Sequence, residues 1–420
     1  MAQVLITIRA ESPLSLGTVK AYGGTLIESG SFVGGGQLRG ALAALKSYAS
    51  TDEKHELDEL LGKPNEAGIC FPNCYLTNSR PAYPVPLTAR TCKQHGGLRG
   101  EKKQDRKRHG VADTLLMQLS YDRIARDGER FRIPLPFQYK CPACGNRTEN
   151  YSGIVEYRGG GEYSAPELYT HRQTRVAINR ARLTAEDGQL YSVRAIDEGS
   201  QFMGFLEVDE TRLEAARRWL KRIARIGGRT SRGFGRVKVT VRDAEPTLLQ
   251  SLDDRIGDFN QRYREFEANL IDIAHQPPEP ETRILFTVNL RADALLRTQT
   301  GLPTLNFDEI LLRDTCQAFL NDAEGQKLGS MRIEAIAHYT QPQHVSGWQT
   351  AWKLPKEVLL ASQMGGLYLF AADVDEVDDG RSALLSVLRT LEQSGIGEMR
   401  EDGYGEVIIC DPFHLEVNPV

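Results

Sequence analysis

Gly227-Gly228-Arg229-Thr230-Ser231-Arg232-Gly233-Phe234-Gly235-Arg236 joins an amphipathic helix, expected at 210–226, to a strand expected at 237–241. Another strand, at 203–208, precedes this helix. The joining stretch is not a Walker loop, because it lacks the Gly-Lys-Ser/Thr ending. It is not a dinucleotide fingerprint either, because its glycines follow a helix instead of opening one. The sequence therefore predicts a strand–helix–strand unit whose second connection is a glycine-rich loop, 227–235.

The same pattern recurs in the second half of the chain. There a strand at 367–374, a helix at 382–393 and a glycine-containing loop at 394–405 lead into a strand at 406–410. Each half also opens with a strand (4–9 and 283–291) that is followed by a helix (37–50 and 307–320). The repetition predicts an α+β fold with two ferredoxin-like (RRM-like) βαββαβ domains in tandem. Chance similarity between two α+β domains is the alternative.

The boundary between the halves lies at the proline-rich stretch 276–281, which cannot be helical. Before it, apolar residues at helical spacing predict a connecting helix within 247–275. We therefore expect a first domain at 1–245 and a connecting helix with a proline-rich linker at 246–281. The second domain is expected at 282–420, with 394–405 as a degenerate copy of the first glycine-rich loop.

Charge is divided unevenly between the two halves. The 420 residues contain 52 Lys and Arg against 56 Asp and Glu, a net charge of only −4. Residues 1–240 hold 37 basic and 26 acidic side chains, a net of +11, whereas 241–420 hold 15 and 30, a net of −15. This asymmetry indicates that one half faces phosphates while the other faces solvent or a basic partner. Two ordinary domains of differing isoelectric point are the alternative.

The first glycine-rich loop has the composition of a phosphate-binding site. Exposed backbone N–H groups, guanidinium groups, hydroxyls and one aromatic ring would cradle a single-stranded phosphate backbone. The candidate residues are Arg229, Thr230, Ser231, Arg232, Gly233, Phe234, Gly235 and Arg236. A tight helix-to-strand turn beside a solvated basic helix is the alternative. In the second loop Glu398, Glu401 and Asp402 leave only Arg400, so we expect that loop to have lost phosphate binding.

The sequence Cys141-Pro142-Ala143-Cys144-Gly145 is a zinc-knuckle pattern, because two thiolates two residues apart can bind one ion and glycine allows the turn. Cys92 is the natural third ligand, and the fourth is His95 or His109. Spacing alone favours His95, since it forms a Cys-x2-His pair with Cys92. A redox pair is the alternative for the two thiols, although no thioredoxin-like context surrounds them. A structural zinc site would hold an inserted segment at about 85–150.

The remaining composition points to a cytoplasmic protein. No apolar run approaches the roughly 20 residues of a membrane span, so no membrane partner is expected. The segment 4–9 alternates like a strand and lacks the charged region and cleavage site of a signal peptide. Seven cysteines spread over the chain do not suggest a disulfide framework.

Three stretches resemble one family. Ser31-Phe32-Val33-Gly34-Gly35-Gly36-Gln37-Leu38-Arg39-Gly40-Ala41-Leu42 resembles the helix start of CRISPR-associated RAMP proteins. The loop 227–237 resembles the glycine-rich loop of that superfamily, and Thr174-Arg175-Val176-Ala177-Ile178-Asn179-Arg180 resembles a further conserved block of it. The resemblance covers the first half in order and the second half more weakly. The chain is most similar to the two-domain, Cas-five-like subunit of type III-D effector complexes.

The resemblance implies a non-catalytic RNA-binding subunit in antiviral defence. Such subunits bind CRISPR RNA near its 5′ handle and join the large polymerase-like subunit to the RAMP backbone subunits, with target RNA as a further candidate partner. Arg39 stands where the family's helix-start arginine approaches RNA, and Lys46 would extend that face. An i,i+4 or capping role is the alternative for Arg39. The arm that contains His171, Arg172 and Arg175 is expected to be a hairpin along the RNA, and a solvated loop is the alternative. The family pattern favours His109 as the fourth zinc ligand.

Two other functions remain open at this stage. RAMP relatives that process precursor RNA cut it without metal by general acid–base chemistry. His171 and Tyr22 are the available groups, but the spacing implies no acid–base pair. Metal-dependent target cleavage would need an aspartate after the first strand, and 11–37 contains none; Asp293 follows the opening strand of the second half. A stand-alone zinc-containing RNA-binding protein is the second of these alternatives.

Overall fold

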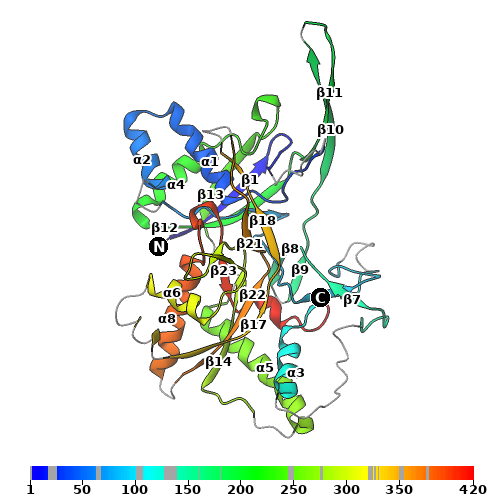
Figure 1. The fold of residues 1–420 in the computed structure, drawn as a ribbon, viewed down its shortest axis with the longest axis vertical. Helices are drawn as coiled ribbons and strands as arrows, with labels where there is room; N and C mark the ends of the chain where they lie inside the picture. Colours follow the sequence, from blue (N-terminus) through cyan, green and yellow to red (C-terminus); the bar gives the residue numbers. More distant parts are fainter. Residues whose placement is uncertain are drawn as a thin grey trace.

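The computed structural model shows a mixed helix–strand architecture, which confirms the predicted α+β class (Figure 1). It describes residues 2–17, 26–62, 68–100, 107–126, 140–159, 161–179, 181–244, 250–274, 278–319, 325, 328–329, 331–349, 354–374 and 378–420. Two four-stranded antiparallel sheets lie one beyond the other along the long axis of the molecule (Figure 1). Among the described helices, none combines the length and the apolar character needed to cross a membrane.

The first sheet is built around β1 (Ala2–Ala10), which pairs with β12 (Gln201–Val208) on one side and β13 (Val237–Asp243) on the other. β3 (Tyr75–Thr77) completes the order β13-β1-β12-β3. Alternate residues of β1, from Val4 to Ile8, are fully buried, because successive side chains of a strand point to opposite faces. They pack with the helices α1 (Gly35–Ala44), α2 (Thr51–Leu61) and α4 (Glu210–Lys221).

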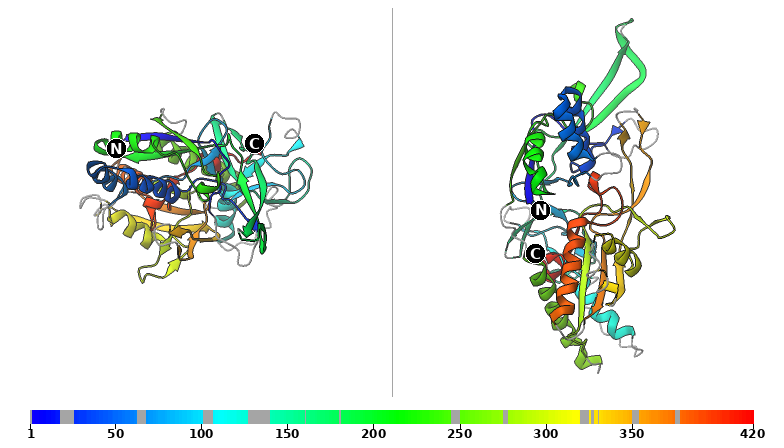
Figure 2. Two further views of the ribbon diagram at one scale, coloured as in Figure 1. Left: turned by 90° about the horizontal axis from the view of Figure 1, so that it is seen from above. Right: turned by 90° about the vertical axis from the view of Figure 1, so that its left-hand side faces the viewer.

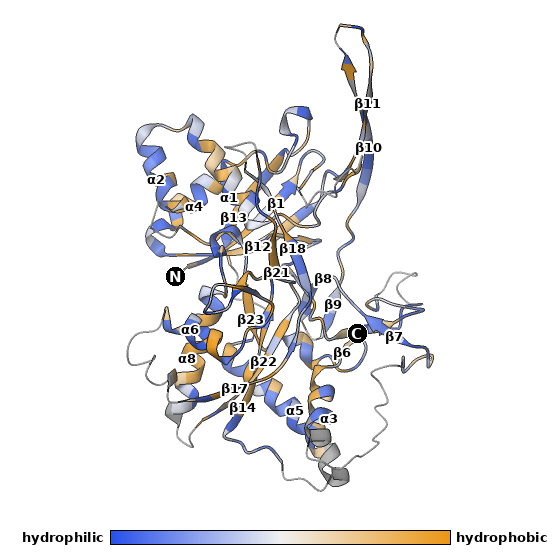
Figure 3. Ribbon diagram, in the orientation of Figure 1, coloured by the Kyte–Doolittle hydropathy of each residue, from blue (hydrophilic) through white to orange (hydrophobic). Residues whose placement is uncertain are grey.

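The second sheet has β14 (Arg283–Leu290) at its centre, between β22 (Leu367–Asp373) and β23 (Val407–Ile409). β17 (Arg332–Tyr339) pairs with the far side of β22. All residues from Ile284 to Leu290 are buried, since helices pack around this strand. These helices are α5 (Leu252–Ala274), α6 (Glu309–Gln317) and α8 (Asp378–Ser394). Apolar residues accordingly concentrate on the strands of this sheet, among them β22 and β23 (Figure 3).

The strands of the two sheets are connected in the same way. When the strands are numbered within each sheet, both have the spatial order 4-1-3-2, and a helix follows the first and the third strand in each. This is the arrangement that a ferredoxin-like βαββαβ chain produces. The expected helices are present with shifted ends. The helix expected at 37–50 ends at Ala44 and continues as a 3-10 turn, Leu45–Tyr48, and the helix expected at 210–226 ends at Lys221.

Long excursions separate the second and third strands of the first sheet. β10 (Thr170–Asn179) and β11 (Thr184–Ile196) form an extended hairpin that projects from the body (Figures 1 and 2), so the predicted hairpin arm is confirmed. The other excursion includes β5 (Ala89–Cys92), β6 (Val111–Asp113), β7 (Thr148–Asn150) and α3 (Leu115–Arg126).

This second excursion is anchored on the other half of the chain. Leu115, Leu116 and Leu119 of α3 belong to the core of the second sheet, where α3 packs along α5. The backbone of Val111 exchanges hydrogen bonds with that of Val420 (3.1 and 2.9 Å). The segment inserted in the first half therefore completes the packing of the second.

The loop 394–405 joins the two halves at the start of α1. A Cβ atom added at Gly35 would lie 2.8 Å from the Cα atom of Gly403 and would also collide with the carbonyl oxygen of Phe71. Gly403 has a φ of +88°, a conformation that favours glycine. The two backbones can approach this closely only because neither position carries a side chain.

We expect Gly35→Ala to lower the free energy of unfolding by about 1–3 kcal/mol, the usual cost of overpacking a close contact. Gly40→Ala in the same helix is the matched control, because a Cβ atom there meets nothing within 4 Å. Alanine favours helix by up to about 1 kcal/mol over glycine, so this control should be neutral or stabilising. Urea unfolding of the full chain measures both. Equal stability of the two variants would contradict the contact.

Candidate RNA-binding site and metal centre

The base of the hairpin packs on the glycine-rich loop. Phe234 is 1 % exposed and forms a small cluster with Val193 and Ala195 of β11. The guanidinium carbon of Arg175 lies over its ring, 5.0 Å from the centroid. Phe234, predicted as one member of the RNA cradle, is therefore buried, and its ring packs the loop against the hairpin.

Three arginines from these two elements form a cationic cluster, which we call the arginine cluster: Arg175, Arg229 and Arg232. Each donates to a neutral acceptor. Arg175 bonds the Gln173 side-chain oxygen (2.9 Å), Arg229 bonds the Ser15 hydroxyl (3.2 Å), and Arg232 bonds the Tyr191 hydroxyl. Within the described part of the chain, no ion pair joins any of the three to a carboxylate. The arginine cluster therefore keeps its positive charge.

The electrostatics of Arg229 reflect this crowding. Burial lowers its pKa, and the nearby positive charges of Arg232 and Arg175 act in the same direction, while Tyr191 opposes them. Its Nε atom is buried and has no hydrogen-bond partner. An arginine side chain stays protonated under such conditions, so an anion beside the arginine cluster would relieve the repulsion between its positive charges.

The backbone of the loop is shaped to expose these groups. Arg229 has a φ of +58°, and a single 3-10 turn, η3 (Thr230–Arg232), leads to Gly233 and Gly235, with φ of +89° and +84°. A Cβ atom at Gly235 would lie 2.5 Å from the carbonyl oxygen of Ile226, whereas the space around Gly233 is open. Ser231 is exposed and Thr230 partly so. The loop thus forms the tight helix-to-strand turn that was the alternative interpretation, and its binding of RNA stays a prediction.

Arg236, at the end of the loop, is held differently. Its guanidinium group donates to the backbone oxygen of Glu11 (3.1 Å) and lies 3.8 Å from the carboxylate of the same residue. Arg236 therefore differs from the arginine cluster in having an acidic neighbour.

Three arm residues share one face of β10. His171, Gln173 and Arg175 alternate along the strand, so their side chains project from the same side of the hairpin. His171 contacts the carboxylate of Asp197 through Nδ1 and the amide nitrogen of Gln173 through Nε2 (2.8 Å). Arg172 is exposed on the opposite face.

Arg39 and Lys46 are matched by carboxylates elsewhere. Arg39 forms an ion pair with Asp402 (3.0 Å), lies 3.8 Å from Glu401, and donates to the backbone oxygen of Leu61 (2.9 Å). Lys46 pairs with Asp58 of α2. The structure does not bring either charge to the arginine cluster, and their contact with RNA stays a prediction.

The basic helix α4 is also neutralised in part. Arg218 pairs with Glu56, Arg222 pairs with Glu53 (2.7 Å), and Arg217 pairs with Asp243. Hydrogen bonding from Arg218 accordingly lowers the pKa of Glu56. Glu53 and Glu56 belong to α2, a helix that was not predicted, although Ser50 and Glu53 form a capping box at its start.

Cys92, His109, Cys141 and Cys144 come together at the end of β5. One ligand atom from each residue lies within 4.8 Å of all the others. The sulfur atoms of Cys92 and Cys144 are 3.6 Å apart, and His109 Nδ1 is 3.3 Å from the sulfur of Cys141. Tetrahedral zinc with Zn–S bonds of about 2.3 Å has S···S edges of about 3.8 Å. These residues therefore have the donor set and the spacing that suit a metal ion.

The second histidine lies beside this cluster and not in it. His95 stacks on His109 with ring centroids 4.6 Å apart, and its backbone oxygen accepts a hydrogen bond from the His109 N–H (2.9 Å). Of the two alternatives, the structure groups His109 with the cysteines. The Asn146 N–H lowers the pKa of the Cys144 thiol, which favours the thiolate form that binds metal.

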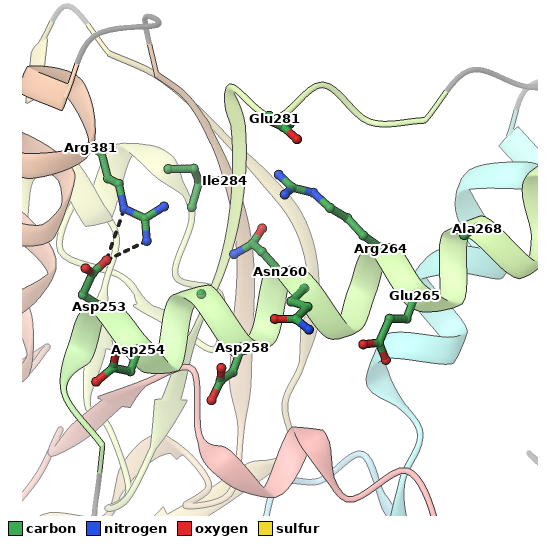
Figure 4. A pocket seen from close by; sticks show the side chains of 12 residues that line it. Asp253, Asp254, Asp258, Asn260, Arg264, Glu265, Ala268, Glu281, Ile284 and Arg381 are labelled. Carbon is green, nitrogen blue, oxygen red and sulfur yellow. Dashed lines mark hydrogen bonds and ion pairs between the residues drawn. The ribbon is translucent and has the colours of Figure 1, made fainter.

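A groove of about 740 Å³ runs beside α5 and is lined by side chains of both charges (Figure 4). Arg381 pairs with Asp253 at one end. The side-chain amide of Asn260 accepts a hydrogen bond from the Leu285 N–H (2.9 Å) and donates one to the Leu285 oxygen (2.8 Å), so it satisfies the backbone of this residue of β14. None of the predicted site residues lines this groove.

The candidate catalytic groups are either engaged or undescribed. Tyr22 lies outside the described residues. Asp293 accepts the Met364 N–H (2.8 Å), and burial raises the pKa of its carboxyl group. Both ring nitrogens of His171 already have partners, as given above.

Residues 79–238 match the family model of the RAMP superfamily. This segment includes the cysteine–histidine cluster, the hairpin and the glycine-rich loop, and in it the chain is similar to that superfamily. No curated protein sequence matches the chain.

Solved structures give remote similarities. A chain of a Type III-B Cmr-beta complex bound to cognate target RNA is 11 % identical, with a TM-score of 0.41 and coverage of 96 % of each chain. A chain of the same kind of complex with target RNA and AMPPnP is 12 % identical, with a TM-score of 0.38 and coverage of 94 % of this chain and 91 % of that one. A Cas6 product complex is 13 % identical, with a TM-score of 0.29 and coverage of 51 % and 78 %.

A double-mutant cycle would test whether Arg39 serves the contact between the two halves. We expect Arg39→Ala and Asp402→Ala each to lower the free energy of unfolding, with a coupling of about 1 kcal/mol, because the Asp402 side chain is only 10 % exposed. Lys46→Ala with Asp58→Ala is the control cycle, where both partners are over a third exposed and the coupling should be at most about 0.5 kcal/mol. Additive effects of Arg39 and Asp402 would refute the assignment.

Proposed function

We propose that this protein is a non-catalytic RNA-binding subunit of a type III, III-D-like, CRISPR effector complex that binds CRISPR RNA near its 5′ handle. The observation that carries the proposal is the arginine cluster, which lies where the glycine-rich loop meets the hairpin inside the RAMP-superfamily segment. Its three guanidinium groups have neutral acceptors, so their charge is available to phosphates.

The surroundings of the arginine cluster suit a single strand. The hydroxyls of Thr230 and Ser231 and the open backbone at Gly233 can donate to phosphate oxygens beside the arginines. Arg172, on the opposite face of β10, would contact the RNA only if the RNA strand passes along the hairpin. Sequence-independent contacts of this kind fit a subunit that holds the backbone of a guide RNA.

We further propose that the two halves, 1–245 and 282–420, are tandem RAMP domains. The shared 4-1-3-2 strand order and the paired loops support this division. In the second half the loop 394–405 contacts α1 through Gly403 and Asp402, so its ligand is the first half of the chain instead of RNA. The acidic surface of the second half suits basic neighbours, namely the large polymerase-like subunit and the RAMP backbone subunits.

The environment of His171 supports a non-catalytic role. A general base must accept a proton from the attacking 2′-hydroxyl, which requires a free ring nitrogen. His171 Nδ1 contacts Asp197, and Nε2 contacts Gln173. Acid–base catalysis would have to break one of these bonds.

We propose that the metal cluster holds structural Zn²⁺. Three cysteines and one histidine complete a tetrahedral shell, and an ion with four protein ligands has no open position for substrate. Bound there, zinc would fasten β5 to the knuckle 141–145 and to His109. Gly110 and Val111 continue from His109 to the backbone of Val420, so the site also fixes the contact with the second half.

Recovery of bound RNA tests the function directly. The full chain, purified from cells that express a CRISPR array and the sister subunits, should carry CRISPR RNA enriched for the 5′ handle and should bring down those subunits. Recovery of neither would refute the proposal. Incubation with CRISPR repeat RNA in EDTA should give no cleavage, and cleavage that is lost in His171→Ala would establish the endoribonuclease instead.

Arg229→Ala combined with Arg232→Ala should weaken binding to CRISPR repeat RNA and flatten its salt dependence. Each lost phosphate contact should reduce the slope of log K against log salt by about 0.7 for a single strand. Arg218→Ala is the control, because its charge is already paired with Glu56. Fluorescence anisotropy over a salt series measures the slopes, and an unchanged slope in the double variant would contradict the site.

Zinc removal should loosen the insertion and the contact with the second half together. The purified chain should contain about one zinc per molecule by elemental analysis, because the four ligands form one closed site. Cys144→Ser should lose the metal and melt at a lower temperature. Cys70→Ser, at an exposed free thiol, should keep the metal content and the melting temperature of the parent. Full metal content in Cys144→Ser would exclude this ligand set.

A further inference from the structure

We infer that Asp197, His171 and Gln173 form a hydrogen-bonded relay that positions Arg175 for RNA, which makes His171 a positioning residue. The inference rests on the proposed function and deepens it, because it assigns a task to three side chains beside the arginine cluster. The relay runs along one face of the hairpin and ends at the arginine cluster.

The donors and acceptors of the relay fit only one arrangement. The ionised carboxylate of Asp197 can only accept, so His171 Nδ1 carries the proton and donates it. A neutral ring then has an acceptor at Nε2, and the amide nitrogen of Gln173 donates to it (2.8 Å). The amide oxygen of Gln173 is thereby turned toward Arg175 and accepts its Nη2–H (2.9 Å). Asp197 thus determines, through His171 and Gln173, that the amide oxygen of Gln173 faces Arg175.

The relay solves a problem that the arginine cluster creates. Three like charges repel one another, and a long arginine side chain would otherwise turn into solvent. A carboxylate partner would hold Arg175 in place but would neutralise the charge that phosphate needs. Gln173 holds it with a neutral oxygen, and the negative charge of Asp197 stays two side chains away. Ser15 and Tyr191 serve Arg229 and Arg232 in the same way.

The relay also gives His171 a task other than catalysis. Its ring has a fixed tautomer, with Nδ1 protonated and Nε2 accepting. In water the opposite tautomer of a neutral histidine prevails. A fixed minority tautomer is therefore a signature that ordinary packing of the hairpin would not produce.

A binding cycle tests the coupling between Gln173 and Arg175. We expect Gln173→Leu to weaken binding of the full chain to fluorescein-labelled oligouridylate about three- to tenfold, in the range for neighbours in one hydrogen-bond network. In the Arg175→Ala background the same substitution should change affinity by less than about twofold. Thr174→Val, on the opposite face, where the hydroxyl meets Ser192 (3.1 Å), is the control and should bind like the parent.

A second measurement does not depend on affinity. In the ¹⁵N spectrum of histidine-labelled protein, with His171→Gln used for assignment, the His171 signal should report protonated Nδ1. Asp197→Asn should move it toward the Nε2-protonated form, because an amide can donate as well as accept. A parent protein with protonated Nε2 would overturn the relay, since Gln173 could not then donate to that atom.

The outcomes separate the relay from the RNA site. If Arg175→Ala and Arg232→Ala both leave RNA affinity unchanged, the proposed function and the relay fail together. If Arg175→Ala weakens binding while Gln173→Leu has no effect, or has the same effect in both backgrounds, only the relay is overturned. Coupled loss of affinity with the expected tautomer supports both.

Discussion

The contact between Gly35 and Gly403 is the constraint on which the arrangement of the two halves depends. Two stretches of backbone meet there with no room for a side chain. The Gly35 N–H donates to the side-chain oxygen of Asn73 (2.9 Å), and Arg39 reaches Asp402 one turn further along α1. Without this approach the acidic loop of the second half could not pair with the arginine of the first. The loop therefore keeps the shape of a ligand-binding turn while its partner belongs to the same chain.

The net charge describes this protein poorly, because many of its basic side chains form ion pairs with acidic side chains of the same molecule. The basic helix α4 faces the acids of α2, and Arg39 faces the second loop. The arginine cluster differs, since its groups are held by an amide, a hydroxyl and a phenol. What distinguishes a binding site from a solvated basic surface is thus the chemical type of the neighbours, and the number of arginines alone does not reveal it.

Local pattern was sufficient for several features. Alternation in β1, the helix before each glycine-containing loop and the repeat of the whole unit predicted the βαββαβ connectivity. The spacing of Cys141 and Cys144 indicated two members of the cluster that could hold a metal ion. Other features depend on contacts that spacing cannot encode. Arg39 and Asp402 are 363 positions apart, and Asp197 reaches His171 across the hairpin. Phe234 is buried because β11 covers it, and choosing His109 over His95 required the family resemblance.

The anchoring of α3 and β6 on the second half has a consequence for synthesis on the ribosome. Leu115, Leu116 and Leu119 emerge early, yet the core that buries them is complete only when β23 and residues near Val420 have been made. At 5–20 residues per second, nearly 300 further residues take about 15–60 s. During that interval the apolar side of α3 stays exposed to solvent, so we expect chaperones at the tunnel exit to bind the nascent chain.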